Sequence, residues 1–166
     1  LHKLFSNPSS DPLAVELSPI LGFCPEKIEF YHQAFCHSSI ESPTYGDNER
    51  LEFLGDSILD SVIAEYLYHQ LPTKDEGVLT DMRSKMVSRR TLNKLAKEFK
   101  IESFVQTNLG GKIPSSILGN AFEALIAAIY LDQGTAFCKD FIIEKIIKQH
   151  FSLINLEKEI SSYKKH

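Results

Sequence analysis

Apolar residues recur at helical spacing along most of the chain. The longest such run predicts a helix over residues 49–70, which Pro72 ends. Its apolar face consists of Leu51, Leu54, Ile58, Leu59, Val62, Ile63, Tyr66 and Leu67. A second strongly apolar helix is predicted from Ser115 or Ser116 to about Asp132, and no segment alternates as strands do. The pattern predicts an all-α fold of about seven helices packed around one or two central apolar ones.

Two shorter helices are predicted to begin at capping residues. Thr73 can cap the first of them, with Glu76 three residues later as in a capping box, and this helix runs to about Val87. Ser88 is the predicted cap of the next helix, over residues 89–99. A serine or threonine at these places satisfies backbone N–H groups that the first helical turn leaves without partners.

The length of 166 residues suits one domain, and 43% apolar residues can bury a sizeable core. We expect a loop-rich segment over residues 1–19, where three prolines occur, with a short helix near residues 13–17. A single domain is expected over residues 20–152, whose last helix spans about residues 136–152. Residues 153–166 are polar and are predicted to be a tail or linker. Because the chain opens with Leu1 rather than Met, missing flanks are expected.

The cysteines and the apolar runs exclude several classes of protein. Cys24, Cys36 and Cys138 are odd in number, far apart and outside any CxxC pair, which argues against a disulfide scaffold and a structural zinc site. Sparse cysteine predicts a reducing, cytoplasmic compartment. No apolar run is long enough to cross a bilayer, so a membrane protein is not expected.

The net charge of −4 argues by itself against nucleic-acid binding, but the charges are unevenly distributed. Seven of the eighteen basic residues fall within residues 83–100. They are Arg83, Lys85, Arg89, Arg90, Lys94, Lys97 and Lys100. This stretch is a candidate for phosphate contacts, and the alternative is a solvated helix face with i,i+4 pairs.

Both central helices carry oxygen-bearing side chains among their apolar residues. Glu49, Glu52 and Asp56 share one stripe of the first helix, at spacings i, i+3 and i+7. Asn120 and Glu123 lie three residues apart on the second. Carboxylates beside a core are costly unless something compensates their charge, and Mg²⁺ or Mn²⁺ suits oxygen ligands from facing helices. Spacing alone leaves open the alternative of solvated acids on amphipathic helices.

Four stretches resemble the ribonuclease III family, in the family's order. The string NERLEFLGDSIL at residues 48–59 closely resembles the family signature and is highly specific. The others are FYHQAFCHSSI at 30–40, DEGVLTDMRSKMVSRRTL at 75–92 and ILGNAFEALIAAIYLDQG at 117–134. The resemblance covers about residues 20–150 and implies the multi-helix endonuclease fold of that family, in a homodimer.

The resemblance also implies a set of site residues. The family's catalytic metal cluster falls on Glu52, Asp56, Asn120 and Glu123, with Asp56 and Glu123 as the main catalytic residues and Mg²⁺, which Mn²⁺ can replace, as the cofactor. A second acidic pair at the edge of the cleft falls on Glu49 and Glu76. The family usually has Asp where this chain has Asn120, so a lower metal affinity is expected, and an active enzyme nonetheless.

The implied activity is cleavage of double-stranded RNA, as in the processing of ribosomal RNA precursors. The products would carry 5′-phosphate and 3′-hydroxyl ends with short 3′ overhangs. The best candidates for RNA binding in the basic stretch are Arg83, Lys85, Arg89 and Arg90. Phe53 matches an aromatic that enters a socket on the partner chain, whereas spacing alone suggests an ordinary core Phe.

Two other functions compete with this interpretation. A non-catalytic RNA-binding scaffold of the same fold is disfavoured because the acidic set is nearly complete. A helical phosphohydrolase acting on nucleotides is disfavoured because such sites use His-Asp pairs, and none of the six histidines lies in such a motif. A separate double-stranded-RNA-binding domain, common in the bacterial family, does not fit into residues 151–166. Weak, salt-sensitive RNA affinity is therefore expected of this chain alone.

Overall fold

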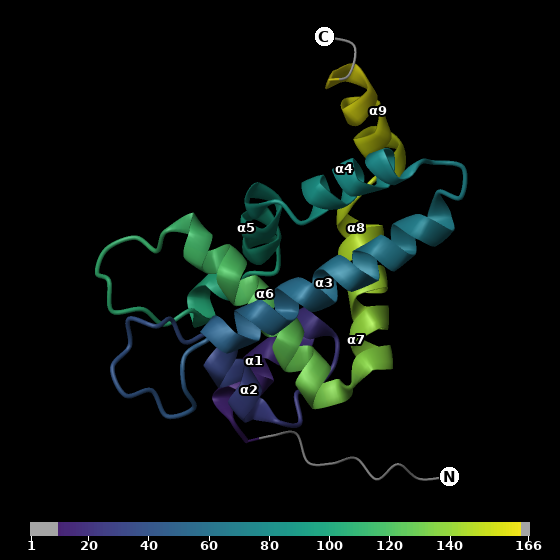
Figure 1. Ribbon diagram of the computed structural model, residues 1–166. Helices are drawn as coiled ribbons and strands as arrows, with labels where there is room; N and C mark the ends of the chain where they lie inside the picture. The colour runs from purple at the N-terminus through teal and green to yellow at the C-terminus, as the bar shows by residue number, and fades with distance from the viewer. Residues whose placement is uncertain (1–9, 164–166) are drawn as a thin grey trace, which may run out of the picture.

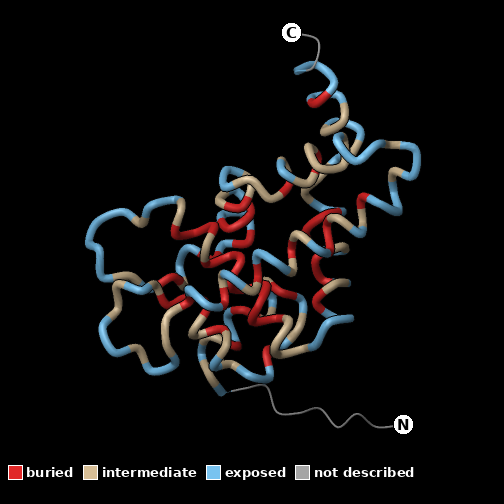
Figure 2. Tube along the Cα trace, in the orientation of Figure 1, coloured by how far each residue is buried: buried red, intermediate tan, exposed pale blue. Residues whose placement is uncertain are grey.

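The computed structural model describes residues 10–163, and these form an all-α fold, as the apolar pattern predicts. Helices α3 (Glu49–Gln70) and α6 (Ser115–Gln133) pack against each other at the centre (Figure 1). Every residue of α6 from Ala121 to Ile129 is buried, because neighbouring helices surround it. Figure 2 shows this buried centre and the exposed outer sides of the other helices. Among the described residues there is no β-strand, only an isolated bridge between Cys36 and Gln106.

The remaining elements surround the central pair. In chain order they are α1 (Pro12–Leu21), α2 (Ile28–Ala34), α4 (Glu76–Met86), α5 (Arg89–Glu98), the short 3₁₀ helix η1 (Ile101–Phe104), α7 (Thr135–Phe141), the π-helical segment η2 (Ile142–Ile147), α8 (Lys148–His150) and α9 (Leu153–Tyr163). The run from α7 through α8 corresponds to the single last helix predicted from the sequence. None of the described helices is both long and apolar enough to span a membrane.

The predicted cap of α5 is confirmed and that of α4 is wrong. The Ser88 hydroxyl accepts a hydrogen bond from the backbone N–H of Thr91 at 3.2 Å, as predicted. Helix α4 is capped by Asp75 rather than Thr73, because the Asp75 carboxylate lies 2.9 Å from the backbone N–H of Val78. A carboxylate two residues further along places the start of the helix at Glu76.

The short helix predicted near residues 13–17 is present as α1 and is longer than predicted, and the predicted tail also contains a helix. Within the loop-rich segment 1–19, Asp11 caps α1, and Pro12 occupies a position where its missing N–H is not needed. Residues 1–9 of that segment lie outside the described residues. In the region assigned to a tail or linker, residues 153–163 form α9.

Polar side-chain contacts, one of them buried, hold the central helices in place. The Asn48 side chain, just before α3, donates to the carbonyl oxygen of Ala34 at 3.0 Å. Near the end of α6, Asp132 accepts hydrogen bonds from the Tyr31 hydroxyl at 2.7 Å and from the backbone N–H groups of Glu26 and Lys27. These contacts fasten both central helices to the segment around α2, so that α3 and α6 keep a fixed register.

Candidate active site

Helices α3 and α6 approach each other most closely at Gly55. A Cβ atom at position 55 would lie 1.7 Å from the backbone carbonyl oxygen of Glu123, far inside van der Waals contact. Only glycine allows this approach, because any side chain would push the two helices apart. The contact places Glu52 and Asp56, on the neighbouring turns of α3, opposite the side chains of α6.

A pocket of about 580 Å³ opens at this crossing. Its lining includes five of the oxygen-bearing residues singled out in the sequence: Glu49, Glu52, Asp56, Asn120 and Glu123. Phe53, Arg89 and Gly119 line the same pocket. Acids separated by about seventy residues along the chain therefore face one space, which neither helix could form alone.

The carboxylates in this pocket are crowded. Glu123 is only 8% exposed, and burial together with the nearby charges of Asp56 and Glu52 raises its pKa to about 8. Burial and the charge of Glu49 raise the pKa of Glu52, while Arg89 acts in the opposite direction. Such mutual repulsion favours either a bound proton or a bound cation at the crossing.

Helix α5 brings Arg89 to the rim of the pocket. The side-chain oxygen of Asn93 accepts a hydrogen bond from the backbone N–H of Gly119 at 3.1 Å. A Cβ atom at position 119 would lie 2.4 Å from that oxygen, so glycine is again required for the contact. The roles of Gly55 and Gly119 were not predicted from the sequence. An isolated glycine inside an apolar helix is the pattern that can indicate such a close helix contact.

The donor set fits a hard divalent cation. Within residues 10–163, no three His, Cys, Asp or Glu side chains are already arranged around a metal position. The pocket nevertheless offers carboxylates from two facing helices and the amide of Asn120, which are the oxygen ligands that Mg²⁺ and Mn²⁺ take. Burial and the charges of Asp56 and Glu52 raise the pKa of Glu123, and a bound cation would favour its ionised form.

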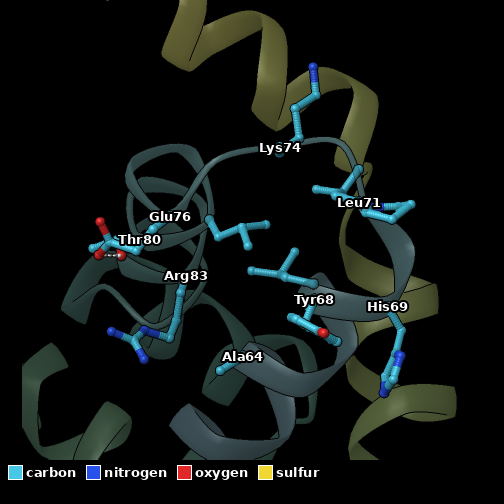
Figure 3. Close-up of a pocket in the computed structure, with 11 residues that line it drawn as sticks. Ala64, Tyr68, His69, Leu71, Lys74, Glu76, Thr80 and Arg83 are labelled. Carbon is cyan, nitrogen blue, oxygen red and sulfur yellow. Dashed lines mark hydrogen bonds between the residues drawn. The ribbon is translucent and has the colours of Figure 1, made fainter.

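Other residues singled out in the sequence lie outside this pocket. Glu76 and Arg83 line a second pocket of about 560 Å³, between α4 and the last turns of α3 (Figure 3). Lys85 and Arg90 line a groove between α9 and the α4–α5 region. Of the four predicted RNA-binding residues, only Arg89 lines the acidic pocket. The basic stretch is continuous in sequence but divided among three surfaces.

Phe53 is not a core residue, contrary to what its spacing alone suggested. Its side chain is 77% exposed although its neighbours Leu51 and Leu54 are packed against the core. Phe53 therefore buries little apolar surface in the isolated chain, and it stands at the edge of the acidic pocket.

A family profile described as Ribonuclease-III-like matches residues 27–150. The chain belongs to this ribonuclease-III-like family. Curated relatives named Ribonuclease 3 include those of Zunongwangia profunda, 44% identical over 89% of this chain, and Flavobacterium psychrophilum, 42% identical over 99%. The chain spans 63% and 70% of the lengths of these two relatives.

Solved structures agree with this family assignment. The nuclease domain of ribonuclease III from Campylobacter jejuni superposes with a TM-score of 0.77 at 32% identity. The match covers 86% of this chain and 99% of that domain. The residues matched by the ribonuclease-III-like profile include the whole acidic pocket, whereas α1 and α9 lie outside them.

Proposed function

We propose that this chain is the nuclease domain of a metal-dependent endoribonuclease that cleaves double-stranded RNA. The observation that carries the proposal is the pocket in which Glu52, Asp56 and Glu123 face one another across the Gly55 contact. The proposed reaction is hydrolysis of a phosphodiester bond that leaves a 5′-phosphate and a 3′-hydroxyl. Processing of structured RNA, such as ribosomal RNA precursors, is the corresponding cellular role.

The proposed cofactor is Mg²⁺, which Mn²⁺ can replace. Glu52, Asp56 and Glu123 would hold it, and Asn120 would contribute an amide oxygen directly or through water. A divalent cation in such a site activates water and stabilises negative charge on the leaving oxygen. Asn120 supplies one negative charge fewer than aspartate, so a higher metal concentration should be required than with an all-carboxylate site.

Arg89 and the other basic residues would position the RNA. Arg89 is the basic residue that lines the acidic pocket, where its guanidinium can hold a phosphate of the cleaved strand beside the carboxylates. Arg83 lines the pocket shown in Figure 3, and Lys85 and Arg90 line the groove between α9 and the α4–α5 region. Contacts of this type recognise backbone and helix shape rather than sequence.

The proposed active form is a homodimer, since cutting both strands of a duplex requires two sites. One solved relative from C. jejuni is described in terms of a region involved in dimer formation. On this chain, Phe53 at one end of α3 and Tyr68 near the other end are both strongly exposed. Between them, on the same side of α3, lie the small side chains of Ser57, Ser61 and Ala64. Such a stripe lets a second α3 cross closely about a two-fold axis.

The pocket in Figure 3 is the proposed socket for the partner's Phe53. It is lined mainly by apolar side chains, including Leu67, Leu71 and Leu79, and Tyr68 stands beside it. Phe53 also lines the acidic pocket of its own chain. Insertion of Phe53 would therefore bring Glu76, on the rim of the partner's socket, to the edge of the acidic pocket. This arrangement would explain why Glu76, a predicted cleft acid, lies apart from the acidic pocket of its own chain.

The activity is tested by incubating the chain with a long RNA duplex, single-stranded RNA and nucleotides. Each substrate is offered with Mg²⁺, with Mn²⁺ and with chelator. We expect the chain to cleave the RNA duplex but neither single-stranded RNA nor nucleotides, and to do so only when metal is present. Asp56→Asn should abolish cleavage, while Glu65→Gln, an exposed acid of the same helix, should retain it. Duplex binding without cleavage in either metal would indicate a scaffold, and nucleotide hydrolysis would indicate the phosphohydrolase alternative.

The dimer is tested by sedimentation velocity. Phe53→Ala should shift the chain toward monomer and reduce cleavage, whereas Leu109→Ala, which truncates another exposed apolar side chain, should change neither. Ala64→Trp, which fills the proposed socket, should weaken association in the same way. Retention of a stable dimer by both Phe53→Ala and Ala64→Trp would refute this interface.

A further inference from the structure

Helix α9 lies against α4 (Figure 1). Acidic residues of α9 form ion pairs there with basic residues of α4 and of the segment before it. Glu157 pairs with Lys74, which precedes α4. One turn further along α9 lies Ile160, which is buried, so the helix docks through apolar packing as well as charge. The contacts therefore fix one face of α9 on the core.

Lys85 is held by α9 in two ways. Its ammonium group donates a hydrogen bond to the Glu159 carboxylate at 3.0 Å. The same ammonium group lies 5.2 Å from the centre of the Tyr163 ring, a cation–π distance. Lys85 belongs to the basic stretch of residues 83–100 and is one of the residues predicted to bind RNA. Helix α9 therefore pairs with a candidate RNA-binding cation.

The groove beneath α9 contains further basic residues. Arg90 and Lys94 line it together with Asn155, Glu159 and Tyr163 of α9. The docked α9 thus stands over the basic edge of α4 and α5, and its Glu159 carboxylate pairs with Lys85 as a phosphate group could.

We propose that α9 is an intramolecular competitor of RNA, which masks Lys85 when docked and moves away when a duplex binds. The inference rests on the proposed function, because it assumes that Lys85 meets RNA. The junction before α9 suits a hinge: Phe151 is extended, with φ −125° and ψ 143°, and separates α9 from α8. Partly exposed ion pairs are weak, each favouring docking by at most about fivefold. A polyanion that meets several basic residues at once can displace them.

The test compares two double variants that each remove two negative charges. The double variant Glu157→Gln, Glu159→Gln removes both ion pairs of α9. The control variant Glu16→Gln, Glu144→Gln removes two exposed acids elsewhere, of which Glu144 pairs with Lys148. Duplex RNA affinity is measured with chelator present, so that no cleavage occurs. The α9 variant should bind roughly three- to tenfold more tightly than the control variant, in the range expected for two partly exposed pairs.

Lys85→Gln shows whether the gain arises from unmasking. In the wild-type background this change should weaken RNA binding little, because Lys85 is already occupied. In the Glu157→Gln, Glu159→Gln background it should remove most of the gain, a non-additivity that a double-mutant cycle measures. Acetylation of Lys85, followed by mass spectrometry, should be several-fold faster in that background, with Lys112 as the reference.

The outcomes separate the inference from the proposed function. Equal Lys85 acetylation in wild type and α9 variant would overturn the docking of α9. Faster acetylation without tighter RNA binding would overturn the competition. Neither result bears on metal-dependent duplex cleavage, which is assayed on the wild-type chain. Failure of that cleavage would refute the proposed function, and a faster acetylation rate would still be expected from docking alone.

Discussion

The backbone of Glu123 in α6 lies directly against Gly55 in α3, with no room for a side chain between them. This contact sets how closely the carboxylates of the two helices approach. It also explains why Glu123 is buried beside Asp56 and has a pKa raised to about 8. The separation of the two helices is therefore a direct determinant of the site's chemistry.

Gly55→Ala should damage both the fold and the site. The added methyl group must move α3 away from α6, at a cost of roughly 2–3 kcal/mol. For a chain of this size, such a loss lowers Tm by roughly 4–12 °C. Cleavage should fall by roughly a hundredfold in protein that remains folded, since small displacements of catalytic groups are costly. Gly77→Ala is the control, because a Cβ there meets only ordinary contacts. A Gly55→Ala variant with wild-type Tm and activity would contradict the close contact.

Glu123→Gln should abolish the response of Tm to divalent metal. Without metal, the variant should be at least as stable as wild type, because it removes a buried carboxylate crowded by Asp56 and Glu52. Metal at a hundred times its Kd would stabilise the wild-type chain by about 2.7 kcal/mol. Differential scanning calorimetry with Mn²⁺ and with chelator measures the difference. An undiminished Mn²⁺ response in the variant would remove Glu123 from the ligand set.

Asn120→Asp should lower the metal concentration needed for activity. The added carboxylate increases the negative charge of the pocket, and the midpoint of the Mg²⁺ titration should fall by about tenfold. Initial cleavage rates across Mg²⁺ and Mn²⁺ concentrations provide the measurement. Superimposable titrations for the variant and the wild type would show that position 120 does not contact the ion.

Tyr31→Phe should destabilise the chain without affecting the metal requirement. The Tyr31 hydroxyl donates to Asp132 at 2.7 Å, and burial with this hydrogen bond raises the pKa of Tyr31. Loss of a hydrogen bond to a charged acceptor should cost about 1–2 kcal/mol in urea unfolding. Tyr45→Phe, at an exposed ring, should cost little. Equal losses in the two variants would show that the Asp132 contact adds no stability.

Asp11→Asn should reduce stability at neutral pH and have little effect in acid. Asparagine can still cap α1, and the change removes the carboxylate that lies 2.9 Å from Nε2 of His32. The hydrogen bond with His32 lowers the pKa of Asp11. A carboxyl group with a lowered folded-state pKa stabilises the fold above its ordinary value of 3.8, and this contribution disappears as pH falls below it. The difference in unfolding free energy, at most about 1 kcal/mol at pH 6, should shrink as the pH falls through the lowered pKa of Asp11. A difference independent of pH would assign the effect to capping.

The sequence alone predicted the two central helices and the family to which the chain belongs. The apolar residues recur with the helical period of 3.6, and this spacing predicted the bounds of α3 correctly. Local periodicity and a following proline decide where such a helix lies. The spacing of Glu49, Glu52 and Asp56 placed them on one stripe, and the motif strings identified the family. These inferences depend on the regular geometry of a helix and on residue type, both of which can be read without a structure.

Only the tertiary structure decided which surfaces those residues share. It placed Glu76 in another pocket, divided the basic stretch among three surfaces, exposed Phe53 and laid α9 over Lys85. The distance between α3 and α6 depends on Gly55, and the approach of α5 to α6 depends on Gly119. The importance of both glycines comes from atoms that belong to distant parts of the chain. Helical periodicity specifies which side of a helix is apolar, but the neighbour that covers it is chosen by packing of the whole domain.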